Sequence, residues 1–212
     1  MSGWSTHSGT ATRLLLDNID TDQILPARFM SQPRSAGYGE FLLHDLRRDT
    51  DGKLDSAFAL NPHPDSSVLI TGDNFGSGSS REAAVYALVD SGIQVVIANG
   101  FGDIFAANAV NNGLLPAVLE IEDLEHLTRL ITDGITPVSV DLNTCSITAN
   151  QQTFTFQLDP TWIDKLINGW DDIDLTLKHA HSISRYREQH RVHRKWAWPV
   201  DTRMFHQPEE EI

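Results

Sequence analysis

Hydrophobic and polar positions along the chain form two successive patterns, and the first alternates short apolar runs with helical stretches. Val68–Thr71 is mostly apolar and β-branched, whereas the residues that follow Arg81 are good helix formers. The alternation continues at the spacing of βαβ units, which predicts a parallel sheet with right-handed crossovers. In chain order the expected elements are a strand at 67–71, a helix at 81–91, a strand at 94–98, a helix at 99–113 and a strand at 114–121.

The second pattern starts after residue 121 and predicts a different kind of structure. A helix is expected over 122–134, and residues 137–158 then form three short alternating runs, which are typical of an antiparallel element. A helix at 160–170 begins with a proline, a residue favoured in the first helical turn. A longer helix is expected over 175–193.

The N-terminal part of the chain, residues 12–30, holds two short apolar runs around the polar turn NIDTD. This composition predicts a strand, a turn rich in side-chain-to-backbone hydrogen bonds, and a second extended piece. Asp20, Thr21 and Asp22 are therefore expected to stabilise the turn. A long loop with proline and glycine breakers follows over 31–53, with room for a short helix.

Taken together, the patterns predict one α/β domain over 1–165, a helical extension over 166–205 and a disordered tail over 206–212. No stretch of about 18 apolar residues is present, and the N-terminus lacks the apolar core of a signal peptide. Cys145 is the only cysteine, so no disulfide can form within the chain. These features predict a cytoplasmic protein that does not span a membrane.

The charge of the chain is acidic overall and uneven along its length. The formal net charge is -13, yet residues 178–212 carry 7 of the 16 Lys and Arg and only 5 of the 29 Asp and Glu. The rest of the chain repels phosphate backbones, so nucleic-acid binding is not expected. The basic end of the chain either forms a solvated helix face, the simpler interpretation, or binds an acidic surface.

The stretch GDNFGSGSSREAAVYAL, from Gly72 onward, carries the candidate chemistry. A strand that ends in a glycine-rich turn and enters a helix presents free backbone N–H groups and positive potential. Gly76 and Gly78 allow a ligand to approach the backbone closely, and Arg81 offers a planar fork that matches a carboxylate. The site is therefore expected to bind a small carboxylate; a Walker phosphate loop is excluded because the G-K-[ST] ending is missing.

A structural alternative exists for Ser79 in this stretch. Ser79 and Glu82 match S-x-x-E, the capping box, in which the serine caps the helix and the glutamate returns a hydrogen bond. One hydroxyl cannot cap the helix and act on a ligand in the same rotamer. Both interpretations of Ser79 remain open at this point.

Three motifs resemble a known family. GDNFGSGSSREAAVYAL resembles the signature of the swivelling β/β/α domain of the aconitase superfamily, and NIDTDQILPARF and NGFGDIFAANAVNNGLLPAVL resemble flanking signatures of 3-isopropylmalate dehydratase (isopropylmalate isomerase) small subunits. The motifs occur in family order and span most of residues 12–120. The stretch 169–190 is also similar to the C-terminal region of that family, whereas the basic segment 191–203 has no counterpart from which a role is carried over.

The resemblance implies a hydro-lyase that interconverts 2-isopropylmalate and 3-isopropylmalate in leucine biosynthesis. It implies that Ser79 is the catalytic base and that Ser80 and Arg81 hold a substrate carboxylate. The loop over 28–40 is where the family distinguishes its substrates, so Arg28 and Phe29 are expected to face the distinguishing group. The alternatives are the same chemistry on citraconate, dimethylmalate or homoaconitate, or a non-catalytic anion-binding regulatory module.

The family also uses a [4Fe–4S] cluster with one open iron. Such a cluster needs three cysteine ligands, and this chain has only Cys145, for which a small core side chain is the simpler role. The resemblance therefore implies a larger partner subunit that bears the cluster, with no cofactor or metal on this chain. The histidines at 179, 181, 190 and 193 lie among arginines and are expected to be solvated.

Overall fold

The structure is a computed structural model that describes residues 2–198. It divides the chain into two compact units, which meet in the sequence between Asp171 and Asp172. The tail predicted over 206–212 lies outside the described residues.

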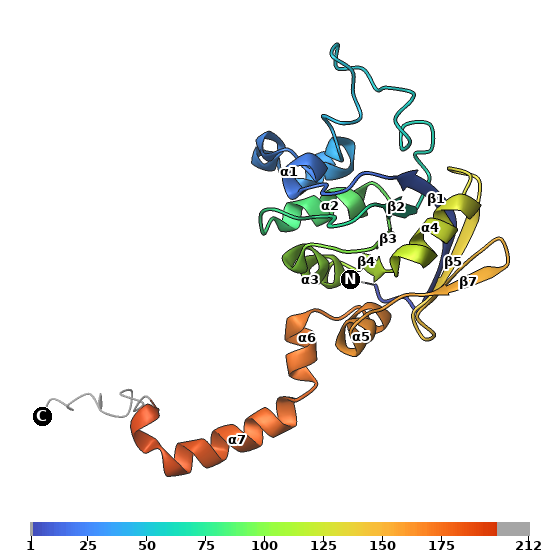
Figure 1. Ribbon diagram of the computed structural model, residues 1–212. Helices are drawn as coiled ribbons and strands as arrows, with labels where there is room; N and C mark the ends of the chain where they lie inside the picture. Colours follow the sequence, from blue (N-terminus) through green and yellow to red (C-terminus); the bar gives the residue numbers. More distant parts are fainter. Residues whose placement is uncertain (1, 199–212) are drawn as a thin grey trace, which may run out of the picture. The chain divides into compact units, whose positions relative to one another are not determined.

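Seven strands of unit 1 form one curled sheet in the order β4-β3-β2-β1-β5-β6-β7 (Figure 1). Their bounds are β1 (Thr6–Leu14), β2 (Val68–Thr71), β3 (Val95–Ala98), β4 (Leu115–Val118), β5 (Pro137–Asp141), β6 (Ser146–Ala149) and β7 (Gln152–Thr155). Strands β1 to β4 are parallel, and β5 to β7 form an antiparallel meander. The predicted parallel and antiparallel elements are both confirmed.

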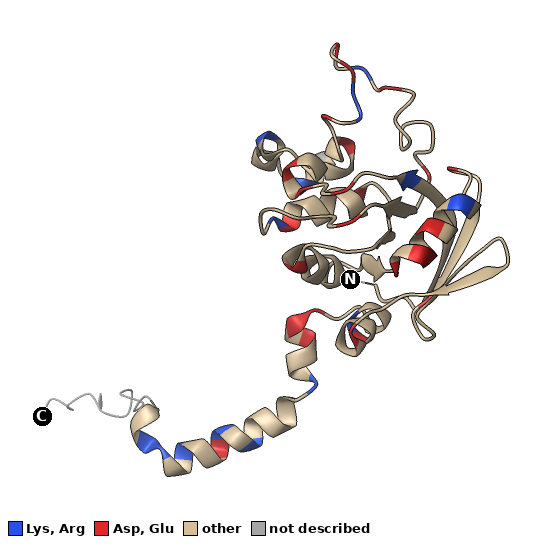
Figure 2. Ribbon diagram, in the orientation of Figure 1, with Lys and Arg blue, Asp and Glu red and all other residues tan. Residues whose placement is uncertain are grey.

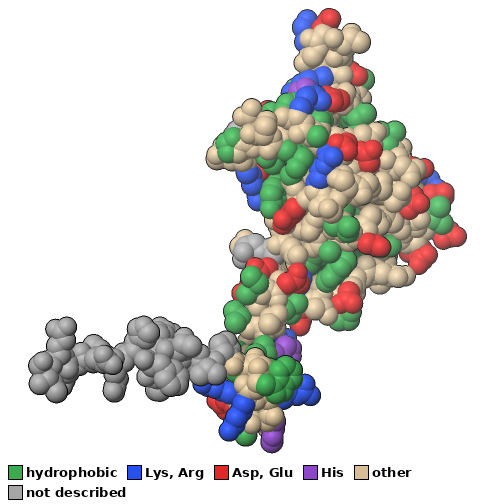
Figure 3. Space-filling model, turned by 90° about the vertical axis from the view of Figure 1, so that its left-hand side faces the viewer, with side chains coloured by type: hydrophobic (Ala, Val, Ile, Leu, Met, Phe, Trp, Pro, Cys, Tyr) green, Lys and Arg blue, Asp and Glu red, His purple; other side chains and the backbone are tan. Residues whose placement is uncertain are grey.

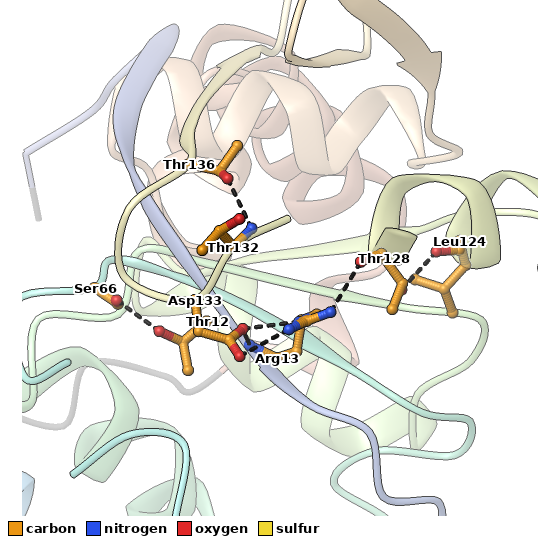
Figure 4. A network of polar contacts seen from close by, with 8 residues as sticks. All are labelled: Thr12, Arg13, Ser66, Leu124, Thr128, Thr132, Asp133 and Thr136. Carbon is orange, nitrogen blue, oxygen red and sulfur yellow. Dashed lines mark hydrogen bonds and ion pairs between the residues drawn. The ribbon is translucent and has the colours of Figure 1, made fainter. Parts of the chain in front are cut away.

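Strand β1 joins the two halves of the sheet. Its first residues, 6–10, pair with β5 in antiparallel register, and its last residues, 11–14, pair with β2 in parallel register. Figure 4 shows how the second half is fixed: the Arg13 guanidinium and backbone amide both bind the Asp133 carboxylate, and Thr12 bonds to Ser66 at 2.7 Å. These contacts hold the second half of β1 to the segments that precede β2 and β5.

Helices cover both faces of the parallel strands. Their bounds in unit 1 are α1 (Thr21–Ile24), α2 (Glu82–Asp90), α3 (Asp103–Asn111), α4 (Ile121–Leu130) and α5 (Pro160–Asn168). Leu69 packs with α2 and α3 on one face, whereas Val68 and Ile70 pack with α4 and the antiparallel strands on the other. In Figure 1, α1, α2 and α3 accordingly lie on the side of the sheet opposite α4.

Two of the predicted secondary-structure elements are wrong. The second extended piece after NIDTD is a short helix, α1, because Asp20 and Gln23 form a capping box at its start. The long helix expected over 175–193 is two helices, α6 (Asp172–Leu177) and α7 (Ala180–His193).

The described part of unit 2, residues 172–198, consists of α6, α7 and a short 3-10 turn, Lys195–Ala197. No residue of these three elements is buried. Figure 2 shows acidic residues at the start of α6 and basic residues along α7, and Figure 3 shows basic side chains and histidines on this unit. This exposure is compatible with both interpretations of the basic end, a solvated helix face and a surface that binds an acidic partner, so the choice between them stays a prediction.

Candidate functional site at the carboxyl edge of the parallel sheet

Two of the three sequence motifs are held side by side beyond the ends of β1 and β2. The amide of Asn18 donates to the Asp73 carbonyl at 2.9 Å, and the amide of Gly76 donates to the Ile19 carbonyl at 2.7 Å. Parallel pairing therefore continues past the strands and into the two turns. In parallel sheets, ligands bind at the carboxyl ends of the strands.

The third motif joins the same edge from the end of β3. The Phe75 amide donates to the Gly100 carbonyl at 3.1 Å, and the Gly102 amide donates to the Phe75 carbonyl at 2.9 Å. Gly102 is also the N-cap of α3. The starts of α1, α2 and α3 thus follow the ends of neighbouring strands.

The two glycines of the central turn have left-handed backbone angles, with φ of 74° at Gly76 and 98° at Gly78. A Cβ on Gly76 would lie 2.2 Å from the Phe105 ring, so packing within the chain alone requires glycine there. A Cβ on Gly78 would meet Thr21 Oγ1 at 3.5 Å, an ordinary contact. Close approach of a ligand to this backbone stays a prediction.

Ser79 is exposed, and Thr21 on α1 fixes its position. The Ser79 amide donates to Thr21 Oγ1 at 3.2 Å, and Thr21 Oγ1 lies 3.5 Å from Ser79 Oγ, within reach for donating a long hydrogen bond. Thr21 itself is buried, which holds its hydroxyl in place. The backbone and hydroxyl of Ser79 are therefore both tied to the NIDTD motif.

The capping interpretation of Ser79 is wrong. Helix α2 begins at Glu82, its N-cap is Arg81, and no side chain caps it. The physical reason is the turn itself: the Ser79 amide is already bound to Thr21, and the Arg81 amide bonds back to the Ser79 carbonyl at 2.8 Å. The Glu82 carboxylate instead accepts a hydrogen bond from Asn112 at 2.8 Å.

Arg81 forms an ion pair with Asp22, the residue after Thr21, through its Nη1 atom. The Arg81 side chain is 22% exposed and that of Asp22 is 56% exposed. Within residues 2–198, Nε and Nη2 of Arg81 make no hydrogen bond. One edge of the guanidinium fork is therefore held by the protein, and the other edge can bind an anion. Ser80, beside it, is exposed.

Arg28 and Phe29 lie in a separate cluster of the preceding loop. The Arg28 guanidinium binds both oxygens of Asp45 and lies 4.6 Å above the centre of the Phe29 ring, which stacks on Phe41 at 4.3 Å. The hydrogen bond from Arg28 holds the pKa of Asp45 well below its ordinary value. Within the described residues, this cluster shares no hydrogen bond or ion pair with residues 79–81, so its role in substrate selection stays a prediction.

Thr21 and Asp22 are the site residues that the sequence analysis missed, because it assigned them to a turn. Their role could have been predicted from position. NIDTD follows one strand and GSGSSR follows the parallel strand beside it, so the two turns meet at the same edge of the sheet. Asp20 does serve the turn, since its carboxylate caps α1 and accepts from the Gln23 amide at 2.7 Å. In NIDTD, Asp20 therefore stabilises the start of α1, and the next two residues, Thr21 and Asp22, contact the site.

No group of three or more metal-ligating side chains occurs among residues 2–198. Cys145 lies in the turn between β5 and β6 rather than in a strand, with φ of 49°. Its half-buried thiol lies 3.6 Å from the Leu142 carbonyl, and burial raises its pKa. None of the helices described is long and apolar enough to cross a membrane.

Comparison with known proteins connects this arrangement to one family. Residues 1–122 match the aconitase C-terminal domain family. A 3-isopropylmalate dehydratase small subunit from Bacillus cereus (strain B4264) is 40% identical over 91% of this chain and 100% of its own length. One from Bacillus thuringiensis subsp. konkukian (strain 97-27) is 42% identical over 89% of this chain and 98% of its own length.

A solved structure is also similar. The crystal structure of 3-isopropylmalate dehydratase from Methanocaldococcus jannaschii aligns with a TM-score of 0.62 and 26% identity, over 85% of this chain and 99% of that one. The expected fold class, the swivelling domain of the aconitase superfamily, is confirmed. The chain therefore belongs to the aconitase C-terminal domain family and, within it, to the 3-isopropylmalate dehydratase small subunits.

Proposed function

We propose that this chain is the small subunit of a 3-isopropylmalate dehydratase, which interconverts 2-isopropylmalate and 3-isopropylmalate by loss and re-addition of water. The observation that carries the proposal is the convergence of an exposed serine hydroxyl and a half-engaged arginine fork at the carboxyl edge of the sheet. The names of the similar Bacillus proteins support the same reaction.

Arg81 and Ser80 hold a substrate carboxylate in this proposal. The guanidinium edge not engaged by Asp22 matches a carboxylate bidentately. Asp22 orients Arg81 from the opposite edge, so the fork is positioned before substrate arrives. Because Asp22 is more than half exposed, solvent screens the ion pair and its contribution to folding stability is small, about 0–1 kcal/mol.

Ser79 acts as the base that removes the proton beside the carboxylate. A neutral serine is a weak base, so the alkoxide form needs stabilisation by nearby positive charge and hydrogen-bond donors. Arg81 and the amides at the start of α2 supply the positive potential, and the Thr21 hydroxyl is within reach to donate to Ser79 Oγ. The hydrogen bond from the Ser79 amide to Thr21 Oγ1 holds the Ser79 backbone against α1.

Departure of hydroxide needs a Lewis acid, which a [4Fe–4S] cluster on a large partner subunit would supply when bound. One cysteine on this chain cannot hold such a cluster. Ser79 and Ser80 are exposed, which suits a site completed by another chain. The small-subunit names of the relatives imply that partner.

The other substrates considered, citraconate, dimethylmalate and homoaconitate, are not favoured, because the similar Bacillus proteins reported above are named for isopropylmalate. The non-catalytic regulatory module is not favoured for the same reason. The cytoplasmic location and the absence of nucleic-acid binding remain predictions from composition. Arg28 and Phe29 remain the residues proposed to face the group that distinguishes substrates.

The experiment that tests the function is reconstitution with the large subunit and assay on a panel of small dicarboxylates. The complex should turn over isopropylmalate faster than the other three substrates. This chain alone should be colourless and inactive, and the large subunit alone should be inactive. Turnover by this chain without its partner, or a preference for another panel member, contradicts the proposal.

A further inference from the structure

A cavity of about 340 Å³ lies at the edge of the parallel strands opposite Ser79. Its wall includes Ser66, just before β2, and Ile93, just before β3, together with Asp90 and Ser91 at the end of α2. Helix α2 has nine residues, about 13 Å of rise, between this cavity and Arg81. The cavity is therefore separate from the candidate active site.

Arg47 in the cavity wall is held in place by its neighbour Asn61. The Arg47 Nε atom donates to Asn61 Oδ1 at 2.7 Å, and Asn61 Nδ2 donates to the carbonyls of Arg47 at 2.8 Å and Asp55 at 2.7 Å. Within residues 2–198, no acceptor bonds to the Nη atoms of Arg47, and these atoms remain accessible to solvent. Asn61 thus orients the Arg47 guanidinium through Nε, and the Nη edge is free to bind a ligand.

The electrostatic surroundings of Arg47 leave it short of negative charge. Burial, followed by repulsion from Arg48, lowers its pKa, and Glu40 opposes that shift. Asp90, the other acidic residue of the wall, is bound by Arg34 through Nε and Nη2, with its shortest contact at 2.6 Å. A carboxylate placed in the cavity would therefore stabilise the Arg47 guanidinium.

Glu40 supplies the opposite charge. Its exposed carboxylate lines the same cavity and forms no hydrogen bond or ion pair with any residue between 2 and 198. The cavity thus presents one open cationic fork and one open anion. A ligand that carries both charges would satisfy the two groups together.

The remaining wall combines aliphatic side chains with Pro64 and the polar side chains of His63, Ser66 and Ser91. Leu42, Leu60 and Ile93 line the cavity and are 1%, 5% and 4% exposed. Cavities that bind small molecules typically measure about 300–1,000 Å³ and combine an apolar lining with a few polar groups. A volume near 340 Å³ suits a ligand of only a few carbon atoms.

We propose that this cavity binds a small zwitterion with an aliphatic side chain, the chemistry of an α-amino acid. The ligand carboxylate binds the open Nη edge of Arg47, its ammonium group binds Glu40, and its side chain packs on Leu42, Leu60 and Ile93. Gly37, Gly39, Glu40 and Leu42 line the cavity, and the first three belong to the end of the loop over 28–40 that is proposed to select the substrate. Bound ligand therefore stabilises one end of that loop.

The test is calorimetric titration of the full chain with L-leucine and two truncated analogues. Isocaproate keeps the carboxylate and side chain but lacks the ammonium group, and isoamylamine lacks the carboxylate. L-leucine should bind, and each analogue should bind at least about tenfold more weakly, the loss expected for one charge-assisted hydrogen bond. Undetectable L-leucine binding at millimolar concentration overturns the proposal, as does equal affinity for all three probes.

Variants assign the binding to this cavity. Glu40→Gln, at an exposed position, should weaken L-leucine at least about tenfold and leave isocaproate unchanged. Glu122→Gln, at an exposed position of α4, is the matched control and should change neither affinity. Arg47→Gln should weaken both ligands; because Arg47 also binds Asn61, its melting temperature is measured first, and if it unfolds the Glu40 comparison decides alone. Full L-leucine affinity in Glu40→Gln shows that the ligand binds elsewhere and overturns the proposal.

Discussion

Asp22 and Arg81, 59 positions apart in the sequence, form an ion pair beyond the ends of two neighbouring parallel strands. The pairing of β1 with β2 brings them together, because the hydrogen bonds between the two turns continue the register of the strands. The contact leaves Nε and Nη2 of Arg81 without a partner among residues 2–198. The fold therefore positions the Nε and Nη2 edge of the Arg81 guanidinium to bind an anion before any ligand is present.

The first prediction concerns that edge. Arg81→Lys keeps the charge but cannot bind Asp22 and a carboxylate with two separate edges, so substrate binding should weaken by roughly 1.5–3 kcal/mol. The measurement is KM and kcat of the reconstituted complex. Arg13→Lys is the control, because Arg13 makes a similar bidentate contact with Asp133 and shares no hydrogen bond or ion pair with residues 79–81 among the described residues. Unchanged kinetics in Arg81→Lys would show that Arg81 does not hold the substrate.

Much of the fold was predictable because a buried strand or helix face requires a recognisable pattern of apolar residues in the sequence. Strands β2 and β3 are buried on both faces and appear as unbroken apolar runs. The break between α6 and α7 is not marked by any such pattern. No residue of either helix is buried, and no glycine or proline marks the join, so the sequence carried neither periodicity nor a breaker at that point.

The site was less predictable because it depends on which turns become neighbours. GSGSSR alone indicated an anion site, but Thr21 lies 58 positions from Ser79, and local patterns carry no information on such a contact. The S-x-x-E spacing at Ser79 suggested a cap, whereas the real capping box is D-x-x-Q at Asp20. Both spacings fit the motif equally well, and tertiary hydrogen bonds decided between them.

The second prediction tests Thr21 as a positioning residue. Thr21→Val keeps the shape of a buried side chain and removes the hydroxyl that lies beside Ser79. Loss of a donor to the alkoxide should lower kcat at least about tenfold, with KM nearly unchanged. Thr12→Val is the matched control, since Thr12 is equally buried and bonds to Ser66 instead. If both variants lose stability and neither loses kcat, Thr21 is only structural.

The third prediction concerns acid stability through Arg13 and Asp133. The hydrogen bond from Arg13, with smaller help from the Arg13 amide and charge, lowers the pKa of Asp133 in the folded chain. The stabilisation is therefore present above the unfolded carboxyl pKa, about 3.9, and is lost as the pH falls through the lower folded value. Asp133→Asn should cost about 1–3 kcal/mol at neutral pH.

Urea unfolding at several pH values checks this third prediction. The gap between the natural chain and Asp133→Asn should narrow as the pH falls below about 4. Asp51→Asn in the exposed loop is the control and should unfold like the natural chain at every pH. A gap that stays constant from neutral to acidic pH would mean that packing, rather than the charged pair, explains the cost.

The last prediction separates chemistry from stability at Ser79. Because α2 begins at Glu82 with no side-chain cap, replacing the Ser79 hydroxyl removes no helix cap. Ser79→Ala should therefore leave the melting temperature nearly unchanged, whereas loss of a cap would cost about 0.5–2 kcal/mol. Because Ser79→Ala also removes the proposed base, it should lower turnover at least about 10²-fold, while affinity for a substrate analogue is nearly kept.

Ser79→Asn sharpens this test, because asparagine is a good cap but cannot form an alkoxide. Both variants should keep the amide bond to Thr21, which the Ser79 backbone makes, so the turn should hold its shape. Melting temperature and turnover are measured for each variant in the reconstituted complex. If Ser79→Asn is as active as the natural chain, Ser79 is not the base. If both variants melt normally and neither turns over substrate, the hydroxyl at the carboxyl edge of β2 removes the proton.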